Sequence, residues 1–546
     1  MKWIYSLFCV GILYRFLMGL QGVDGVDMGF CNTFYQVFFP HPDANTFNFI
    51  YYFLGLIGAL WEKFFGSYGL LGFRLLELLT LSGAITLMYA TFHDVLTRRY
   101  VGLAIILSFV FPTMFVTFHY NTLSFLFISV SAYCYKKSVF SDKSFWLLLA
   151  GVAIGMAFFV RIVNGTLFVL LIIPLIYYWR TRNALHAVKK AAIMLGGVAC
   201  GMSCIILIIF MLGQETYYMD ALREAFATFQ GSEATHSHGH LVGRYFKSFV
   251  NVILQIVTIL ILYYAYQKSC SFPSKWKHLA FVLLTIVFLI LSYTSHPYLT
   301  AFSLCVILIL YGCIRKNSCT SDKMGIVCVY LLVAAVVYPF GSDIGVQGVF
   351  NWCAGLLIFP AMWCVSQFVM PERVKPLKVA FFSILICAVL RTVLYVYGED
   401  VSRFACTEQI HSERLNVFTT PEKAARYAHT INAINQYVGE NRLLFVTNQA
   451  SELYYATRTL PFEGHVQPVI YRGERLIWRL NERLAHFGEY PLIAMLNQEK
   501  PSSETSEVQS ITKQWMKRHR YQLVYDDGYL KLYACKQSDR YKIIAP

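Results

Sequence analysis

The sequence predicts a polytopic α-helical membrane protein that carries a small α/β domain at its C-terminal end. Three observations predict this fold class: an apolar composition, a series of long apolar runs, and cations that recur in alternate loops. Of the 546 residues, 57% are hydrophobic and 14% are charged, and the mean hydropathy is +0.51. Soluble globular domains are much more polar. The net charge of +15 is spread between the apolar runs, which excludes nucleic acid as a partner.

About thirteen apolar runs are long enough, together with their flanking aromatic residues, to cross a hydrocarbon core of about 30 Å. The first run follows a single lysine and has no small-residue cleavage site, so we expect a retained transmembrane helix and not a removed signal peptide. The runs lie at residues 3–20, 69–92, 100–118, 121–135, 145–160, 165–179, 191–213, 248–266, 279–293, 300–314, 324–340, 351–370 and 379–397.

The positions of the cations set the expected orientation. With a cytoplasmic N-terminus, the inner loops hold clusters of Lys and Arg, whereas most outer loops hold almost none. This is the positive-inside distribution, and an odd number of spans places the C-terminus outside. We therefore expect a multi-pass protein of a bacterial inner membrane, surrounded by membrane lipids. The cations of the inner loops are Arg98, Arg99, Lys136, Lys137, Lys143, Arg180, Arg182, Lys189, Lys190, Lys268, Lys275, Lys277, Arg315, Lys316, Lys323, Arg373, Lys375 and Lys378.

The composition becomes polar after Tyr397, which divides the chain into a transmembrane domain, 1–397, and an extracytoplasmic domain, 398–546. The second domain alternates helical and strand patterns, and an Asp-Gly turn predicts a β-hairpin near its end. We therefore expect a small α/β domain. Its predicted elements are helices at about 421–438 and 504–519, strands near 443–446 and 491–494, and a hairpin of 521–525 and 529–533.

The first external loop, at about 21–67, carries Asp24 and Asp27 and has no cation before Lys63. Its second half, 48–65, is apolar and aromatic, as in a helix that lies along the membrane interface. A carboxylate beside such a segment is suited to act as general base between a lipid-borne donor and an aqueous acceptor. The alternative is that both aspartates only form turns in a glycine-rich loop.

Polar residues at the outer ends of other spans are candidates for binding a substrate phosphate or sugar. Arg161 lies at an external turn where most other loops lack cations, and Arg391 lies inside the last span, where a charge is costly without a partner. Asn121 and Asn164 lie at span ends and are polar enough to face a cavity. The alternatives are arginines that snorkel to the lipid headgroups and ordinary interfacial turns.

A long external segment, from about 214 to 247, is expected to form a mobile substrate loop in which Arg244 and Lys247 meet a lipid phosphate. Alternating histidines at 236–240 could bind a divalent cation, but they lack the i, i+4 spacing of a helical metal site. We therefore assign no metal ligand and no definite cofactor. Asp343, in a glycine-flanked segment, is a candidate to orient a sugar or acceptor hydroxyl, or else an ordinary turn residue.

Several of these features occur in a characteristic order along the chain. A retained first span is followed by a long acidic loop, the entry Phe39-Pro40-His41-Pro42, an interfacial helix, Phe65-Gly66 and Phe73-Arg74-Leu75-Leu76. This order resembles the GT-C integral membrane glycosyltransferases, such as protein O-mannosyltransferases and lipid A aminoarabinose transferases. Relatives often have two prolines where this chain has His41-Pro42-Asp43, which leaves the subfamily open.

The resemblance implies an enzyme that moves a sugar from a polyprenyl-phosphate donor to an extracytoplasmic glycan, lipid or protein acceptor. It also implies that a carboxylate of the first loop is the catalytic base. Asp27 matches that position best, and Asp24 is second.

Two other classes of protein remain as alternatives. A transporter or flippase of lipid-linked sugars would fit the many spans, but such proteins usually contain inverted repeats, and the sequence shows none. An assembly protein would use the C-terminal domain to bind a partner, with no chemistry.

Overall fold

The computed structural model describes most of the chain, in segments separated by short gaps. Asp343 and His236, which the sequence singled out, lie outside the described residues. The described segments are 2–112, 117–230, 238–269, 273–294, 297–314, 319–341, 345–368, 383–384, 386–387, 389–399, 401–471, 473–497 and 502–536.

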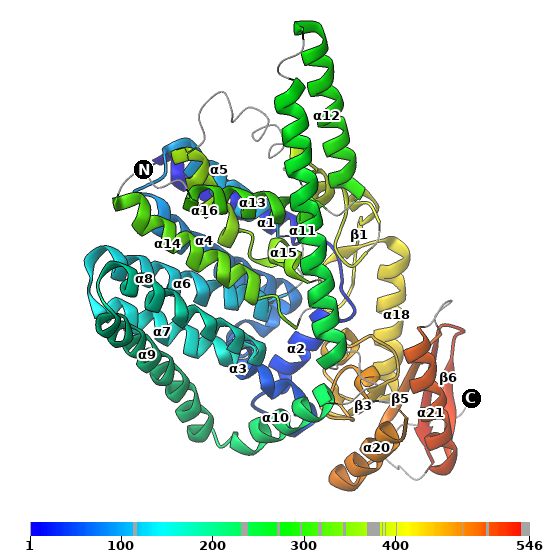
Figure 1. Cartoon of the computed structure of the whole chain (residues 1–546). Coiled ribbons are helices and arrows are strands. Elements are labelled where there is room, and N and C mark those ends of the chain that lie inside the picture. The colour runs from blue at the N-terminus through cyan, green and yellow to red at the C-terminus, as the bar shows by residue number, and fades with distance from the viewer. Residues whose placement is uncertain are drawn as a thin grey trace.

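The chain up to residue 368 is helical (Figure 1). Its elements are α1 (Lys2–Met18), α2 (Asp27–Val37), η1 (Pro42–Asn45), η2 (Phe47–Tyr51), α3 (Tyr52–Phe65), η3 (Gly66–Tyr68), α4 (Gly69–Phe92), α5 (Arg98–Val110), α6 (Tyr120–Ser141), α7 (Ser144–Val160), η4 (Ile162–Leu171), α8 (Ile172–Thr181), α9 (Ala184–Met211), α10 (Glu215–Gln230), α11 (His238–Ser269), α12 (Ser274–Thr294), α13 (Pro297–Ile314), α14 (Cys319–Val337), η5 (Val346–Gly348), α15 (Val349–Trp352) and α16 (Gly355–Phe368).

Four helical segments of the described chain are long and apolar enough to cross a membrane, or five if two helices bent by 95° count as one span. The mostly helical fold is therefore confirmed, whereas the number of about thirteen spans stays a prediction. The four segments are Phe47–Phe92, Ile162–Thr181, Ala184–Met211 and Leu241–Lys268, and the bent pair is Val346–Trp352 with Gly355–Gln367.

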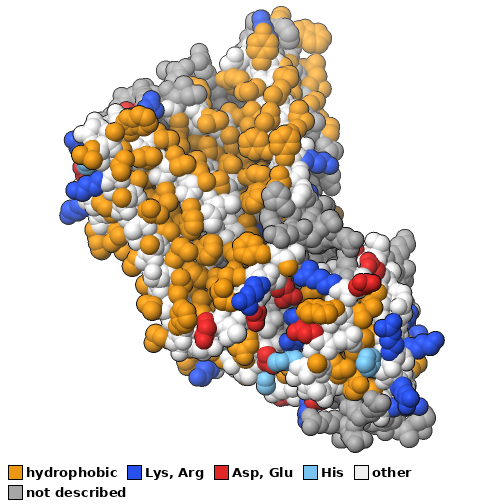
Figure 2. Space-filling view, turned by 60° about the horizontal axis from the view of Figure 1, so that its bottom comes forward, with side chains coloured by type: hydrophobic (Ala, Val, Ile, Leu, Met, Phe, Trp, Pro, Cys, Tyr) orange, Lys and Arg blue, Asp and Glu red, His pale blue; other side chains and the backbone are white. Residues whose placement is uncertain are grey.

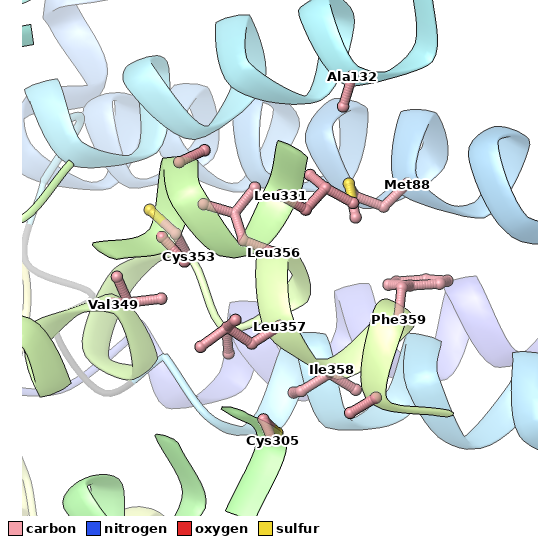
Figure 3. Close-up of a cluster of buried hydrophobic side chains, with 14 of the residues drawn as sticks. Met88, Ala132, Cys305, Leu331, Val349, Cys353, Leu356, Leu357, Ile358 and Phe359 are labelled. Atoms are coloured by element: carbon pink, nitrogen blue, oxygen red, sulfur yellow. The ribbon is translucent and has the colours of Figure 1, made fainter. Parts of the chain in front are cut away.

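Glycines bring the backbones of α7 and α9 together. A Cβ at Gly151 would lie 2.0 Å from the Met194 carbonyl oxygen, and one at Gly197 would lie 2.1 Å from the Leu148 carbonyl oxygen. Small residues permit this close approach, which supplies van der Waals contact where no hydrophobic effect drives helices together in lipid. The same part of the molecule contains a large apolar core, in which Met88, Leu331 and Phe359 lie close together, as Figure 3 shows.

The segment expected to be a mobile loop at 214–247 is largely helical. Helix α10 and the first turns of α11 occupy its described part, so the expectation of a loop was wrong there. The reason is an apolar face: Tyr218 and Ala221 recur at helical spacing and are buried. Figure 1 shows α11 continuing into a long hairpin with α12 that extends beyond the other helices.

The C-terminal part contains a five-stranded sheet with the strand order β4-β3-β5-β7-β6. Strand β3 pairs in parallel with β4 and β5, and β7 pairs antiparallel with β5 and β6. The predicted helices, strands and hairpin are confirmed, and the domain boundary at 397 stays a prediction. The elements are β1 (Glu408–Gln409), β2 (Phe418–Thr419), α18 (Pro421–Tyr437), β3 (Leu443–Val446), α19 (Glu452–Thr457), β4 (Leu460–Pro461), α20 (Gly473–Phe487), β5 (Leu492–Leu496), α21 (Ser503–Arg518), β6 (Tyr521–Asp526) and β7 (Leu530–Cys535).

Helix α2 of the first loop packs directly on this C-terminal part. The Ser451 hydroxyl donates hydrogen bonds to the carbonyl oxygens of Gly25 and Val26, at 3.1 and 2.7 Å. A Cβ at Gly29 would lie 2.0 Å from the Glu452 backbone nitrogen, so a glycine is needed at this crossing. Figure 2 shows hydrophobic side chains over the helical part, and charged side chains gathered over the C-terminal part and the adjoining helix ends.

Candidate functional site

Asp24 caps the N-terminus of α2. Its carboxylate accepts the backbone N–H groups of Val26 and Asp27, at 3.2 and 3.1 Å. These are donors that the first turn of a helix leaves without intrahelical partners. Burial raises the pKa of Asp24 above its ordinary value, although these hydrogen bonds and the charge of Lys423 oppose the shift. Asp24 thus makes the hydrogen bonds of a turn-forming residue.

Asp27 is the first residue of α2 and is half-buried. Its negative charge contributes to raising the pKa values of four side chains, namely Cys31, Tyr51, Tyr120 and Tyr397. These residues come from the first loop, from the start of α6, and from the chain that leads into the C-terminal part. Asp27 therefore lies where three distant segments of the sequence meet.

An aromatic stack runs beside Asp27. The Phe30 ring meets Tyr51 edge-on, with centroids 5.5 Å apart, and Tyr51 stacks on Tyr120 at 5.0 Å. The guanidinium carbon of Arg161 lies 5.2 Å from the centre of the Tyr120 ring. Tyr51 and Tyr120 are thus within electrostatic reach of both the Asp27 carboxylate and the Arg161 guanidinium. The two sequence candidates, Asp27 and Arg161, are brought into one site.

Three buried side-chain nitrogens near this stack have no hydrogen-bond partner among the described residues. They are Nη1 of Arg161, Nδ2 of Asn121 and Nε2 of His119, and we call these residues the nitrogen cluster. A buried polar group without a partner costs about 1–3 kcal/mol. A ligand with several acceptor oxygens would remove that cost, and a phosphate is such a ligand.

His119 takes part in the nitrogen cluster as a neutral donor. Burial, followed by the charge of Arg161, lowers the pKa of His119 to about 3. Its Nδ1 accepts the backbone N–H of Asn121 at 3.3 Å, so the neutral ring carries its proton on Nε2. The free nitrogen of His119 is therefore a hydrogen-bond donor at neutral pH.

Buried neighbours hold the nitrogen cluster in place. The Glu77 carboxylate accepts the backbone N–H of His119 at 3.2 Å and the hydroxyl of Thr122. The Tyr338 hydroxyl donates to Oδ1 of Asn121, which orients Nδ2 of the same amide. Sequence reasoning missed both Glu77 and Tyr338. A lone carboxylate inside an apolar span usually marks a functional region, and Glu77 was visible on that ground.

The remaining candidates lie apart from the nitrogen cluster or are already bonded. Asn164 is buried, and its Nδ2 donates to Ser124 Oγ and to the Ala157 carbonyl oxygen, both at 2.8 Å. Its Oδ1 has no partner in the described chain. The other three cations, Arg391, Arg244 and Lys247, are all exposed.

Within the described residues, no group of three or more His, Cys, Asp or Glu side chains could hold a metal ion. The side chains of the alternating histidines at 236–240 lie outside the described residues. The possibility of a divalent cation at those histidines therefore stays a prediction.

The sequence matches no protein-family model, and no curated protein matches it significantly. Solved structures are similar in the arrangement of their elements. The crystal structure of the Archaeoglobus fulgidus oligosaccharyltransferase with zinc and sulfate gives a TM-score of 0.49 at 9% identity, and covers 90% of this chain and 68% of that chain. The oligosaccharyltransferase AglB of the same organism, in complex with an inhibitory peptide and a dolichol-phosphate, gives 0.47 at 10% identity, and covers 98% and 74%.

These neighbours belong to the GT-C superfamily of membrane glycosyltransferases, which the sequence of this chain resembles.

Proposed function

We propose that this chain is a membrane glycosyltransferase that moves a sugar from a polyprenyl-phosphate donor to an extracytoplasmic acceptor, with inversion at the anomeric carbon. One observation carries the proposal: the Asp27 carboxylate and the Arg161 guanidinium of the nitrogen cluster both act electrostatically on the same aromatic pair, Tyr51 and Tyr120. A base and a phosphate-binding group, held close together, are the two parts that this reaction requires.

The reaction follows from these two parts. Asp27 accepts the proton of an acceptor hydroxyl, and the oxygen attacks the anomeric carbon of the donor sugar. The bond from that carbon to the phosphate oxygen breaks, and the electron pair leaves with the polyprenyl phosphate. Arg161, Asn121 and His119 donate hydrogen bonds to the phosphate, and these bonds strengthen as its charge develops.

The other assignments follow from this function. Residues 1–397 would form the catalytic transmembrane domain, and residues 398–546 would form an extracytoplasmic domain on the side of the acceptor. The N-terminus would be cytoplasmic, as expected for a bacterial inner-membrane protein. Arg391, Arg244 and Lys247, which are exposed, would attract the lipid phosphate from outside the nitrogen cluster, and Asp343 and Asn164 would orient hydroxyl groups.

The test is the replacement Asp27→Asn, which keeps the shape of the side chain and removes the base. We expect the rate of sugar transfer in reconstituted membranes to fall by about 10²- to 10⁴-fold. Insertion, gel-filtration profile and melting temperature should remain those of the wild type. A variant that transfers at the wild-type rate would contradict the assignment.

Mass spectrometry of membrane glycans and lipids, compared between cells with and without the protein, would identify the first substrates for this assay. Liposome assays on the same preparation separate the transporter alternative. Movement of a labelled lipid-linked sugar across the bilayer, with no new glycoside formed, would favour a flippase.

A further inference from the structure

A polar cavity lies in the C-terminal part of the chain, where Gly25, just before α2, approaches Glu452. It has a volume of about 260 Å³ and lies between α18, the start of α19 and the turn before β7. Its wall includes Glu399, Lys423, Arg426, Tyr427, Glu452 and Tyr529. Pockets for drug-sized ligands start at roughly 300 Å³, so this cavity fits a small ligand or one end of a larger one.

Glu452 supplies a buried carboxyl oxygen without a partner. Its side chain lines the cavity although the residue is only 3% exposed. Oε1 accepts the Tyr427 hydroxyl at 2.7 Å, whereas Oε2 is buried and has no hydrogen-bond partner among the described residues. An unsatisfied carboxyl oxygen in such a place is costly, and a ligand hydroxyl that forms a hydrogen bond with it would remove the cost.

The charge state of Glu452 narrows the kind of ligand. Burial raises its pKa to about 8, and the Asp24 charge adds to this, against the opposing effects of the Tyr427 hydrogen bond and Lys423. At neutral pH the Glu452 side chain in the cavity is therefore mostly a neutral carboxyl group. A neutral carboxyl group pairs well with hydroxyl groups, whereas an ammonium ligand would require the ionised form.

The walls of the cavity suit a sugar ring. The Arg426 guanidinium lies over the ring of Tyr529, with 4.8 Å between its carbon and the ring centroid. Aromatic faces carry partial negative charge and attract the slightly positive C–H faces of a sugar. Lys423 forms an ion pair with Glu399 at 3.0 Å, so these charges are already compensated. The cavity thus combines the aromatic ring of Tyr529 with the hydrogen-bonding carboxyl group of Glu452. It has little net charge that a ligand would have to neutralise.

The cavity is fastened to the segment that carries Asp27. A Cβ at Gly25 would lie 3.2 Å from the free oxygen of Glu452. The preceding residue, Ser451, donates a hydrogen bond from its backbone N–H to the Gly25 carbonyl oxygen at 3.0 Å. Gly25 is two residues before Asp27, so a ligand in the cavity would end close to the proposed base.

We propose that the Glu452 cavity binds a sugar ring of the acceptor, so that the acceptor is a glycan. This assignment of the acceptor rests on the proposed transferase function, whereas the binding of a sugar by the cavity does not. Tyr529 stacks on the ring, and the free carboxyl oxygen of Glu452 forms a hydrogen bond with one of its hydroxyl groups.

The test measures ligand binding to the full-length protein in detergent by saturation-transfer NMR. The probes are methyl glycosides of the common hexoses and N-acetylhexosamines, and an uncharged serine-containing hexapeptide for comparison. We expect at least one glycoside to bind the wild type and the peptide not to bind. Glu452→Ala should weaken glycoside binding about tenfold, equivalent to about 1.4 kcal/mol, because it removes the carboxyl group that forms a hydrogen bond with the ligand.

The controls separate binding from folding. Glu474→Ala, on the exposed face of α20, removes a carboxyl group outside the cavity and should leave binding unchanged. Tyr529→Leu keeps the Glu452 carboxyl group and should also weaken glycoside binding. If one of the two cavity variants fails to fold, the other still tests the site. The proposal is overturned if no glycoside binds the wild type, if both cavity variants bind as the wild type does, or if only the peptide binds.

Asp27→Asn distinguishes failure of this proposal from failure of the transferase function. It should bind glycosides like the wild type while losing transfer. If this variant retains transfer, the proposed function is wrong. The binding data then decide independently whether the Glu452 cavity is a sugar site. If transfer is lost but no glycoside binds, the acceptor is not a glycan held by this cavity.

Discussion

The two polar regions beside α2 differ in what they lack. Among the described residues, the nitrogen cluster of His119, Asn121 and Arg161 has buried donors without acceptors, whereas the Glu452 cavity has a buried carboxyl oxygen without a partner. The first therefore suits an anion, and the second suits a neutral compound rich in hydroxyl groups. Asp27, at the start of α2, acts on the tyrosines beside the first region, and Gly25, two residues before it, contacts Glu452 of the second. The difference indicates that a charged substrate and a neutral substrate would bind in two separate regions near the same carboxylate.

The largest effect should come from the nitrogen cluster. Arg161→Ala removes the cation of the cluster, and we expect the KM for the polyprenyl-phosphate donor to rise about tenfold to a hundredfold, because a hydrogen bond to a charged group contributes about 1.5–3 kcal/mol. Steady-state kinetics in reconstituted membranes measure this change. Arg391→Ala is the matched comparison, and its effect should be smaller because Arg391 is exposed. Equal effects would show that the buried cluster does not hold the phosphate.

A smaller effect is expected on the pH dependence of stability, to which Glu452 of the second region contributes. Glu452 has a pKa of about 8 in the folded protein against an ordinary value of 4.5. Below 4.5 the carboxyl group is protonated in both states, and between the two values only the unfolded state ionises, so rising pH destabilises the fold. Glu452→Gln has no such group.

The melting temperature of Glu452→Gln, relative to the wild type, should therefore increase from pH 5 to pH 8 and stay constant above that range. If the difference in melting temperature between the variant and the wild type does not change from pH 5 to pH 8, Glu452 is ionised at every pH in this range. The cavity would then not be the neutral partner of the nitrogen cluster.

The smallest effect concerns the cap that both regions share. Asp24→Ala removes the acceptor of the Val26 and Asp27 N–H groups, and should cost about 1 kcal/mol of stability. Asp24→Asn keeps a capping oxygen, so it should cost less. Urea or thermal unfolding in detergent compares the two variants. If both cost the same, the charge of Asp24 and not its hydrogen bonds is what matters at this turn.

The sequence predicted most accurately those elements that local rules determine. Helix α18 begins at Pro421, as expected, because the side chain of Thr420 accepts the N–H of Lys423 and proline suits the first helical position. The β6–β7 hairpin follows from its Asp-Gly turn. Both signals are contained within a few neighbouring residues.

What the sequence missed depends on contacts between distant segments. Glu452 looks like an ordinary helix-start carboxylate until α19 packs on α2 and removes it from water. The charges at 214–247 obscured the apolar spacing of Tyr218 and Ala221, whose burial makes α10 a helix. Arg161 and Asp27 were both chosen from the sequence, but their shared aromatic pair comes from two other segments.

The hydrogen bond from Ser451 to Gly25 also has a consequence for biosynthesis. Its partners are separated by 426 positions in the chain. At a synthesis rate of about 5–20 residues per second, the first loop would wait roughly 20 to 90 s for the segment on which it packs. During that time the face of α2 that packs on Ser451 and Glu452 has no partner. Quality control and chaperones would therefore act on this segment, and the nascent chain would gain this contact only after α19 has emerged.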